Sequence, residues 1–181
     1  VLPFVNLSKD EAQEYFSDGL TEELLNVLAK NPKLPVTSPT SPFSFKGKEV
    51  DIKTIAEKLN VTHVLEGSVR KAGNQLRITA QLIEGATDSH LWSQTYDRQM
   101  ENIFAVQEDI AGSVAGAPKV TLEGGQPPKA QQTNPEAYNA FLQGRYFFDG
   151  RTKEDYEKAI GYYEQALQID PNYARAQVGL S

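Results

Sequence analysis

The sequence predicts an α/β fold of the α+β kind: a mixed sheet of roughly five strands with packed helices, followed by an all-α helical hairpin. Residues 62–97 alternate between apolar and polar side chains over three successive segments, which is typical of half-buried antiparallel strands. The flanking segments instead repeat apolar residues every three or four positions, as amphipathic helices do. Residues 118–133 are rich in Gly, Pro and Gln, which indicates a linker between the two parts.

The first part of the chain supplies elements that pack on this sheet. Residues 1–5 form a short apolar strand, and Pro3 favours an edge position because it lacks an amide donor. Residues 20–28 have helical periodicity, and residues 34–37 predict a further strand. In the helix, four side chains are expected to face outward, namely Thr21, Glu22, Glu23 and Asn26.

A short helix comes next, capped by Asp51 and closed by Asn60 as a left-handed cap. The three central strands follow it. Residues 72–74 and 85–88 are turn segments whose residue types tolerate positive φ. One face of the sheet is expected to be covered by helices and the other, polar face to be left for solvent or a partner.

Helical periodicity returns after the sheet. Residues 101–116 predict a helix whose apolar stripe lies across the sheet. Beyond the linker, residues 134–148 and 152–169 predict two helices, and a third begins near residue 172.

The second half resembles a tetratricopeptide repeat. Ala159, Tyr163, Ala166 and Pro171 fall at offsets of four, seven and twelve, the spacing of the second helix of such a repeat. Gly144 resembles a position in the first helix, although the distance to Ala159 is three residues longer than in the family. One hairpin buries little core by itself, so we expect it to dock on the α/β part or on another subunit.

The first half resembles the TolB amino-terminal-like domain. The matching blocks are VLPFVNLS at 1–8, EYFSDGLTEEL at 14–24, FSFKGKEVD at 43–51, VLEGSVRKAGNQLRITAQLI at 64–83 and HLWSQTYDR at 90–98. The resemblance implies a regulatory module without catalytic residues. Such modules accompany tetratricopeptide repeats in bacterial class III nucleotide cyclases and CadC-like winged-helix transcriptional regulators. It further implies three segments: a TolB-like α/β domain at 1–117, a linker at 118–133 and a truncated repeat at 134–181.

Composition limits the function classes. The chain has 181 residues and a net charge of −6, which argues against a nucleic-acid surface. It has no cysteine, so it can offer no thiolate ligand or cysteine nucleophile. It also has no apolar run long enough to span a membrane.

Because the chain begins at Val1 without methionine, we interpret it as a fragment. A cytoplasmic location is favoured, and a periplasmic one behind an upstream anchor stays open.

No catalytic, cofactor or metal site is expected. His63 and His90 are the two histidines, and they lack the convergent partners that a metal site or catalytic dyad needs. The adjacent carboxylates Glu22 and Glu23 point about 100° apart on a helix, so we interpret them, like Glu154 and Asp155, as a solvated helix face.

The expected partner is a protein or peptide, and formation of a homodimer stays open. Five residues are the candidate contacts: Arg70, Arg77 and Trp92 on the sheet, and Tyr138 and Gln165 on the repeat's concave surface. Aromatic and arginine side chains dominate interface hot spots. The polar face of the sheet would offer both kinds if Trp92 and Tyr96 lie on it together with the arginines. We favour the other reading, in which Trp92 lies at the rim or under a helix, because the register is not fixed by the sequence. Two further classes stay open: a sensor of a nucleotide or metabolite, and a fragment of an adenylate or guanylate cyclase polypeptide.

Overall fold

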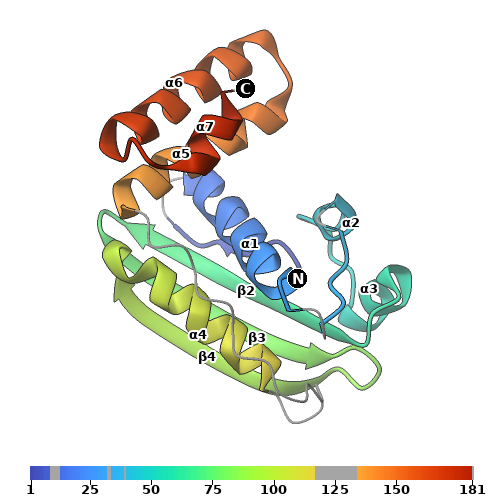
Figure 1. The fold of residues 1–181 in the computed structure, drawn as a ribbon. Helices are drawn as coiled ribbons and strands as arrows, with labels where there is room; N and C mark the ends of the chain where they lie inside the picture. Colours follow the sequence, from blue (N-terminus) through green and yellow to red (C-terminus); the bar gives the residue numbers. More distant parts are fainter. Residues whose placement is uncertain (9–12, 32–33, 39, 117–133, 181) are drawn as a thin grey trace.

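A four-stranded mixed sheet is the base of the fold (Figure 1), with strand order β1-β2-β3-β4. The strands are β1 (Val5–Asn6), β2 (His63–Ala72), β3 (Gln75–Glu84) and β4 (Ser89–Gln99). The computed structural model describes residues 1–8, 13–31, 34–38, 40–116 and 134–180. The predicted linker at 118–133 therefore lies outside the described residues.

The three central strands form the predicted antiparallel meander. Leu65 pairs with Leu82 and Val69 with Ile78, so the apolar residues of β2 and β3 share one face. The β2–β3 turn contains Gly73 at φ +58°, a conformation that glycine adopts without strain. β1 runs parallel to β2, with Val5 opposite Ser68, which makes the sheet mixed.

The predicted strand at 34–37 is wrong. Residues 34–38 form no strand. Leu34 and Val36 are partly buried and pack against the main core. Pro35 has no amide hydrogen to donate to a neighbouring strand, which disfavours a ladder in so short a segment. The described part of the sheet therefore has four strands.

Helices α1 (Glu14–Ala29) and α4 (Ile103–Ala115) cover the apolar face of the sheet (Figure 1). Helix α1 buries 11 of its 16 residues because the terminal helices lie on its other side. Glu23, predicted to face outward, is therefore 6% exposed. Thr21, also predicted to face outward, is 0% exposed because its hydroxyl faces the Phe4 amide on the opposite side. Asn26 is exposed as predicted.

A second, smaller core lies on the opposite face of the sheet. Helix α3 (Ile52–Leu59) begins with Asp51, whose carboxylate accepts a hydrogen bond from the amide of Thr54 at 2.8 Å. It ends at Asn60 in the left-handed conformation, so both predicted caps are confirmed. Ile55 and Ala56 of this helix pack on Val64 of β2, which covers one end of the otherwise polar face.

The terminal helices pack on the far side of α1 (Figure 1). They are α5 (Pro135–Gly150), α6 (Lys153–Ile169) and the short α7 (Ala174–Gly179). Their buried residues belong to the same apolar cluster as those of the sheet and α1. No helix within the described ranges is long and apolar enough to cross a membrane.

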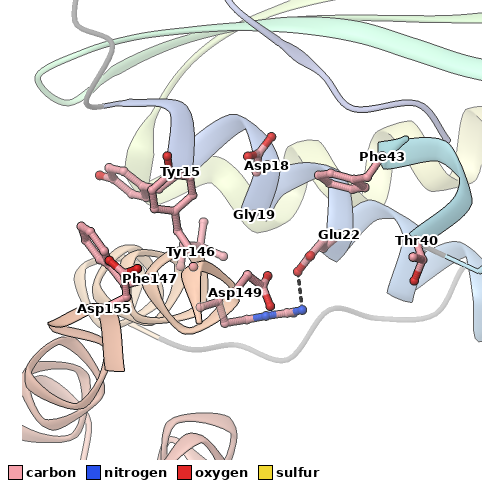
Figure 2. Close-up of a pocket in the computed structure, with 13 residues that line it drawn as sticks. Tyr15, Asp18, Gly19, Glu22, Thr40, Phe43, Tyr146, Phe147, Asp149 and Asp155 are labelled. Atoms are coloured by element: carbon pink, nitrogen blue, oxygen red, sulfur yellow. Dashed lines mark ion pairs between the residues drawn. The ribbon is translucent and has the colours of Figure 1, made fainter. Parts of the chain in front are cut away.

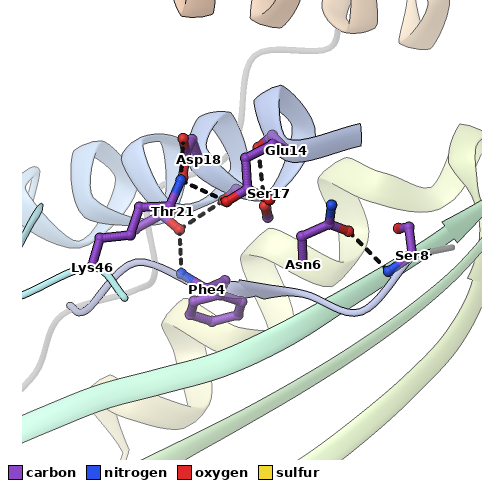
Figure 3. A network of polar contacts seen from close by, with 8 residues as sticks. All are labelled: Phe4, Asn6, Ser8, Glu14, Ser17, Asp18, Thr21 and Lys46. Atoms are coloured by element: carbon purple, nitrogen blue, oxygen red, sulfur yellow. Dashed lines mark hydrogen bonds and ion pairs between the residues drawn. The ribbon is translucent and has the colours of Figure 1, made fainter. Parts of the chain in front are cut away.

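Phe4, which directly precedes β1, contacts both helix α1 and the sheet (Figure 3). Its amide donates to the hydroxyl of Thr21 on α1 at 2.9 Å, and its ring is fully buried. The ring lies over Gly67 of β2, where a Cβ would come within 2.6 Å of a ring carbon and 2.1 Å of the carbonyl oxygen of Thr79. Gly67 is therefore needed for this close approach.

We predict that Gly67→Ala lowers the free energy of unfolding by about 1–3 kcal/mol, because the new methyl group meets a backbone oxygen that cannot move independently. Gly161→Ala is the matched control, since it lies inside α6 with nothing within 4 Å of the new Cβ. It should stabilise the protein by up to about 1 kcal/mol through helix propensity. Urea denaturation measures both, and equal effects at the two positions would contradict this role of Gly67.

Candidate functional site

The open part of the polar sheet face includes three rows of side chains that run across the strands. Arg70 lies directly opposite Arg77, and Arg77 lies opposite Asp97. The Arg77 guanidinium donates to both carboxylate oxygens of Asp97, at 2.6 and 3.1 Å, and this hydrogen bonding lowers the pKa of Asp97. The other rows are Glu66, Gln81 and Ser93, and Ser68, Thr79 and Thr95.

Trp92 lies on the opposite face from these arginines. It pairs with Leu82 and shares its face with Tyr96, which pairs with Ile78. Trp92 is half-buried against the main core, and Tyr96 is 2% exposed. The structure therefore brings Arg70 and Arg77 together but not Trp92, as the favoured reading of the sequence expected.

The two candidates on the repeat also lie apart. Gln165 is exposed on α6, whereas Tyr138 is 1% exposed. The Tyr138 hydroxyl accepts a hydrogen bond from the Gln107 amide of α4 at 2.7 Å, and its ring packs on Phe104 with centroids 4.9 Å apart. Tyr138 is therefore a packing residue between the hairpin and the sheet layer, and its prediction as an accessible contact is wrong.

The two histidines lie at one end of the sheet without converging on an acidic cluster. His63 begins β2 and His90 lies near the start of β4, with β3 between them. Nδ1 of His63 is 2.8 Å from the Thr62 hydroxyl. Among the residues that the structure describes, no group of three or more His, Cys, Asp or Glu is placed to hold a metal ion.

A groove of about 660 Å³ lies between α1, the short helix α2 (Thr40–Phe43) and the α5–α6 hairpin (Figure 2). We call it the junction groove. Glu22 of α1 and Asp149 of α5 point into the same space. Its aromatic lining is Tyr15, Phe43, Tyr146 and Phe147, and its charged lining is Asp18, Glu22, Arg145, Asp149 and Asp155.

The α1 wall of the groove is an acidic stripe whose partners come from other elements. Glu14, Asp18 and Glu22 recur at intervals of four, which places them on one helix face. The Lys46 ammonium, from the loop after α2, lies 2.7 Å from Glu14 and 2.5 Å from Asp18 (Figure 3). Arg145 of α5 forms an ion pair with Glu22.

Two carboxylates of the acidic stripe have raised pKa values even though these cations are present. Burial raises the pKa of Asp18 above its ordinary value despite the hydrogen bond from Lys46. Burial likewise raises the pKa of Glu22 despite the charge of Arg145. The negative charge of Asp149 raises both pKa values further, so the carboxylates of α1 and α5 share one electrostatic environment.

This groove is not predicted from the sequence. Glu22 and Glu23 were interpreted as a solvated helix face, yet Glu23 is 6% exposed and hydrogen-bonded to Arg175 of α7. The sequence does contain one signal for the groove, which is that Glu14, Asp18 and Glu22 are spaced four residues apart. Like charges at that spacing destabilise an isolated helix. The pattern therefore indicates that other elements supply cations.

One curated relative covers the whole chain. It is a protein named putative adenylate cyclase 3 from Rhizobium meliloti (strain 1021), which is 40% identical over 184 residues. The match spans all of this chain but 31% of the relative's length. No family model matches the chain.

Two solved structures are similar to parts of the chain. The LpoB C-terminal domain from Salmonella enterica has a TM-score of 0.33 at 17% identity, over 53% of this chain and 77% of that domain. The lipoprotein GNA1162 from Neisseria meningitidis has a TM-score of 0.40 at 14% identity, over 65% of this chain and 96% of that protein. At these TM-scores neither likeness establishes a common fold.

Proposed function

We propose that this chain is a non-catalytic regulatory module of a bacterial signalling protein, which binds a protein or peptide and relays that event to an effector domain. In this proposal, residues 1–117 are a TolB-like α/β domain and residues 134–181 begin a tetratricopeptide array. The supporting observation is that the terminal helices and the α/β part are joined by buried polar contacts. In this proposal, a partner bound to one part acts on the other through these contacts.

One of these contacts is made by Glu23 of α1. Both of its carboxylate oxygens accept hydrogen bonds from the Arg175 guanidinium of α7, one of them at 2.5 Å. Arg145 of α5 lies 3.8 Å from the same carboxylate. The Arg175 guanidinium also lies 4.8 Å from the centroid of the Phe141 ring, so a single arginine links α1, α5 and α7.

The packing of α5 on α6 supports the tetratricopeptide interpretation. Ala159, Tyr163 and Ala166 are all buried, as expected for residues of a second repeat helix that face the first. A Cβ on Gly144 would lie 2.6 Å from the Tyr163 ring, so glycine is needed at this crossing. In this interpretation, the three additional residues are assigned to the turn, where α5 extends to Gly150 and Arg151 adopts the left-handed conformation.

A second candidate is that the chain takes part in nucleotide cyclisation, which the name of the 40%-identical relative suggests. The match leaves most of that relative outside the aligned region. The named activity can therefore reside in the remainder of that protein, with this chain as its regulatory portion.

We predict that Arg175→Met lowers the free energy of unfolding by about 3 kcal/mol, because it leaves a buried carboxylate without its main cation. Lys153→Met is the control, since Lys153 and Glu157 form an exposed pair at 4.0 Å that contributes at most about 0.5 kcal/mol. Hydrogen exchange should show that the amides of α1 lose protection in Arg175→Met alone. Unchanged protection of α1 would mean that the two parts are independent, and the relay would be rejected.

The two candidate functions give different results with nucleotides. A non-catalytic protein-binding module should neither convert ATP or GTP to a cyclic product nor melt at a higher temperature in their presence. A ligand at a hundred times its dissociation constant would stabilise the fold by about 2.7 kcal/mol, which a thermal shift detects. Turnover by the purified chain would establish the cyclase alternative, and a saturable shift without turnover would establish a sensor.

A further inference from the structure

We propose that the junction groove binds a basic peptide segment of a partner protein, with a lysine or arginine side chain held between the carboxylates of α1 and α5. This inference deepens the proposed function and rests on it, since it names the surface and the chemistry of the partner. The occupant is a cationic stretch of another polypeptide.

The lining of the junction groove has a net negative charge. Asp18, Glu22, Asp149 and Asp155 contribute four negative charges and Arg145 contributes one positive charge, which leaves −3. Lys46 and Glu14 cancel each other at the groove's margin. Among the described residues, no ion pair engages Asp149, and this residue is exposed. Such a concave surface of one sign attracts a partner of the opposite sign.

Exposed aromatic rings at the groove are a second observation that favours a cationic partner, and it does not depend on the charge. Tyr146 is 42% exposed where α5 borders the groove, and Phe148 and Tyr156 just beyond it are 49% and 40% exposed. The rings of Phe148 and Tyr156 contact each other edge-on with centroids 5.4 Å apart. Exposed aromatic rings beside carboxylates suit a lysine or arginine, whose charge interacts with a ring face while its alkyl stem covers apolar surface.

The hairpin itself contains one contact between a lysine and an aromatic ring. The Lys158 ammonium lies 5.1 Å from the centroid of the Phe147 ring, and Phe147 also lines the groove. An incoming side chain would repeat that contact on the neighbouring Tyr146 ring, with Asp149 as its counter-ion.

Two features favour a basic polypeptide over other occupants. A second copy of this chain has a net charge of −6, so an acidic groove would repel most of its surface. The exposed rings of Phe148 and Tyr156 also follow the lining residues Phe147 and Asp155 in sequence, so an extended segment would contact the groove and these rings at once.

The test uses the full chain and a labelled, end-blocked peptide of alternating arginine and glycine. Its matched control is the same peptide with citrulline in place of arginine, which keeps the shape and removes the charge. We expect saturable binding of the arginine peptide in fluorescence anisotropy and at least about tenfold weaker binding of the citrulline peptide.

Variants locate the binding. Asp149→Lys should weaken the arginine peptide at least about tenfold because it places a cation beside the incoming one. Glu57→Lys changes the net charge equally, on the exposed surface of α3, and should change the affinity less than about twofold. Tyr146→Ala should weaken binding several-fold, whereas Ile160→Ala, which removes a side chain 47% exposed on α6, should not.

Each contrary result has one meaning. Equal effects of Asp149→Lys and Glu57→Lys, or equal binding of the two peptides, would overturn the proposal in favour of general charge attraction. Spermine that binds as tightly as the peptide would assign the groove to a small amine, and a dimer abolished by Asp149→Lys would assign it to a second copy. Nucleotide turnover would reject the proposed function itself, while failure of peptide binding alone would reject this groove as its site.

Discussion

The arrangement depends on the need to neutralise a carboxylate in the middle of the protein. Helix α1 is covered by the sheet on one side and by the terminal helices on the other, and Glu23 lies 6% exposed between them. A buried charge without a partner is costly, and both guanidiniums that reach it come from beyond residue 134. Helix α1 can therefore keep this acid buried only while α5 and α7 are in place.

The same constraint produces the junction groove. Helix α1 carries its acidic stripe along the edge of the contact with the hairpin, and each cation that neutralises it belongs to a different element. The hairpin contributes one arginine to the groove but also Asp149 and Asp155. Docking therefore adds more negative than positive charge to the groove, and this excess is built into the junction. Burial is the main cause of the raised pKa of Asp18 and Glu22, and the charge of Asp149 adds to it.

The features predicted from the sequence are those that neighbouring residues determine. The alternation in β2 and β3, the Asp51 and Asn60 caps of α3 and the helical stripe of α4 depend on local spacing, and the structure confirms them. Residues whose environment depends on distant elements were harder to predict. The local pattern does not encode that α4 covers Tyr138. It also left two readings of Trp92 open, because the face of this residue depends on the register of β4.

The position of the groove has a thermodynamic consequence for a bound partner. Asp18 and Glu22 belong to α1, whereas Asp149 belongs to α5, so a cation held between them is attracted to both parts of the molecule. Binding would then favour the docked arrangement over any arrangement in which α5 leaves α1. By linkage, binding favours docking by the same factor by which docking strengthens binding. The Glu23–Arg175 contact, although it lies outside the groove lining, would thus influence affinity there through the docking equilibrium alone.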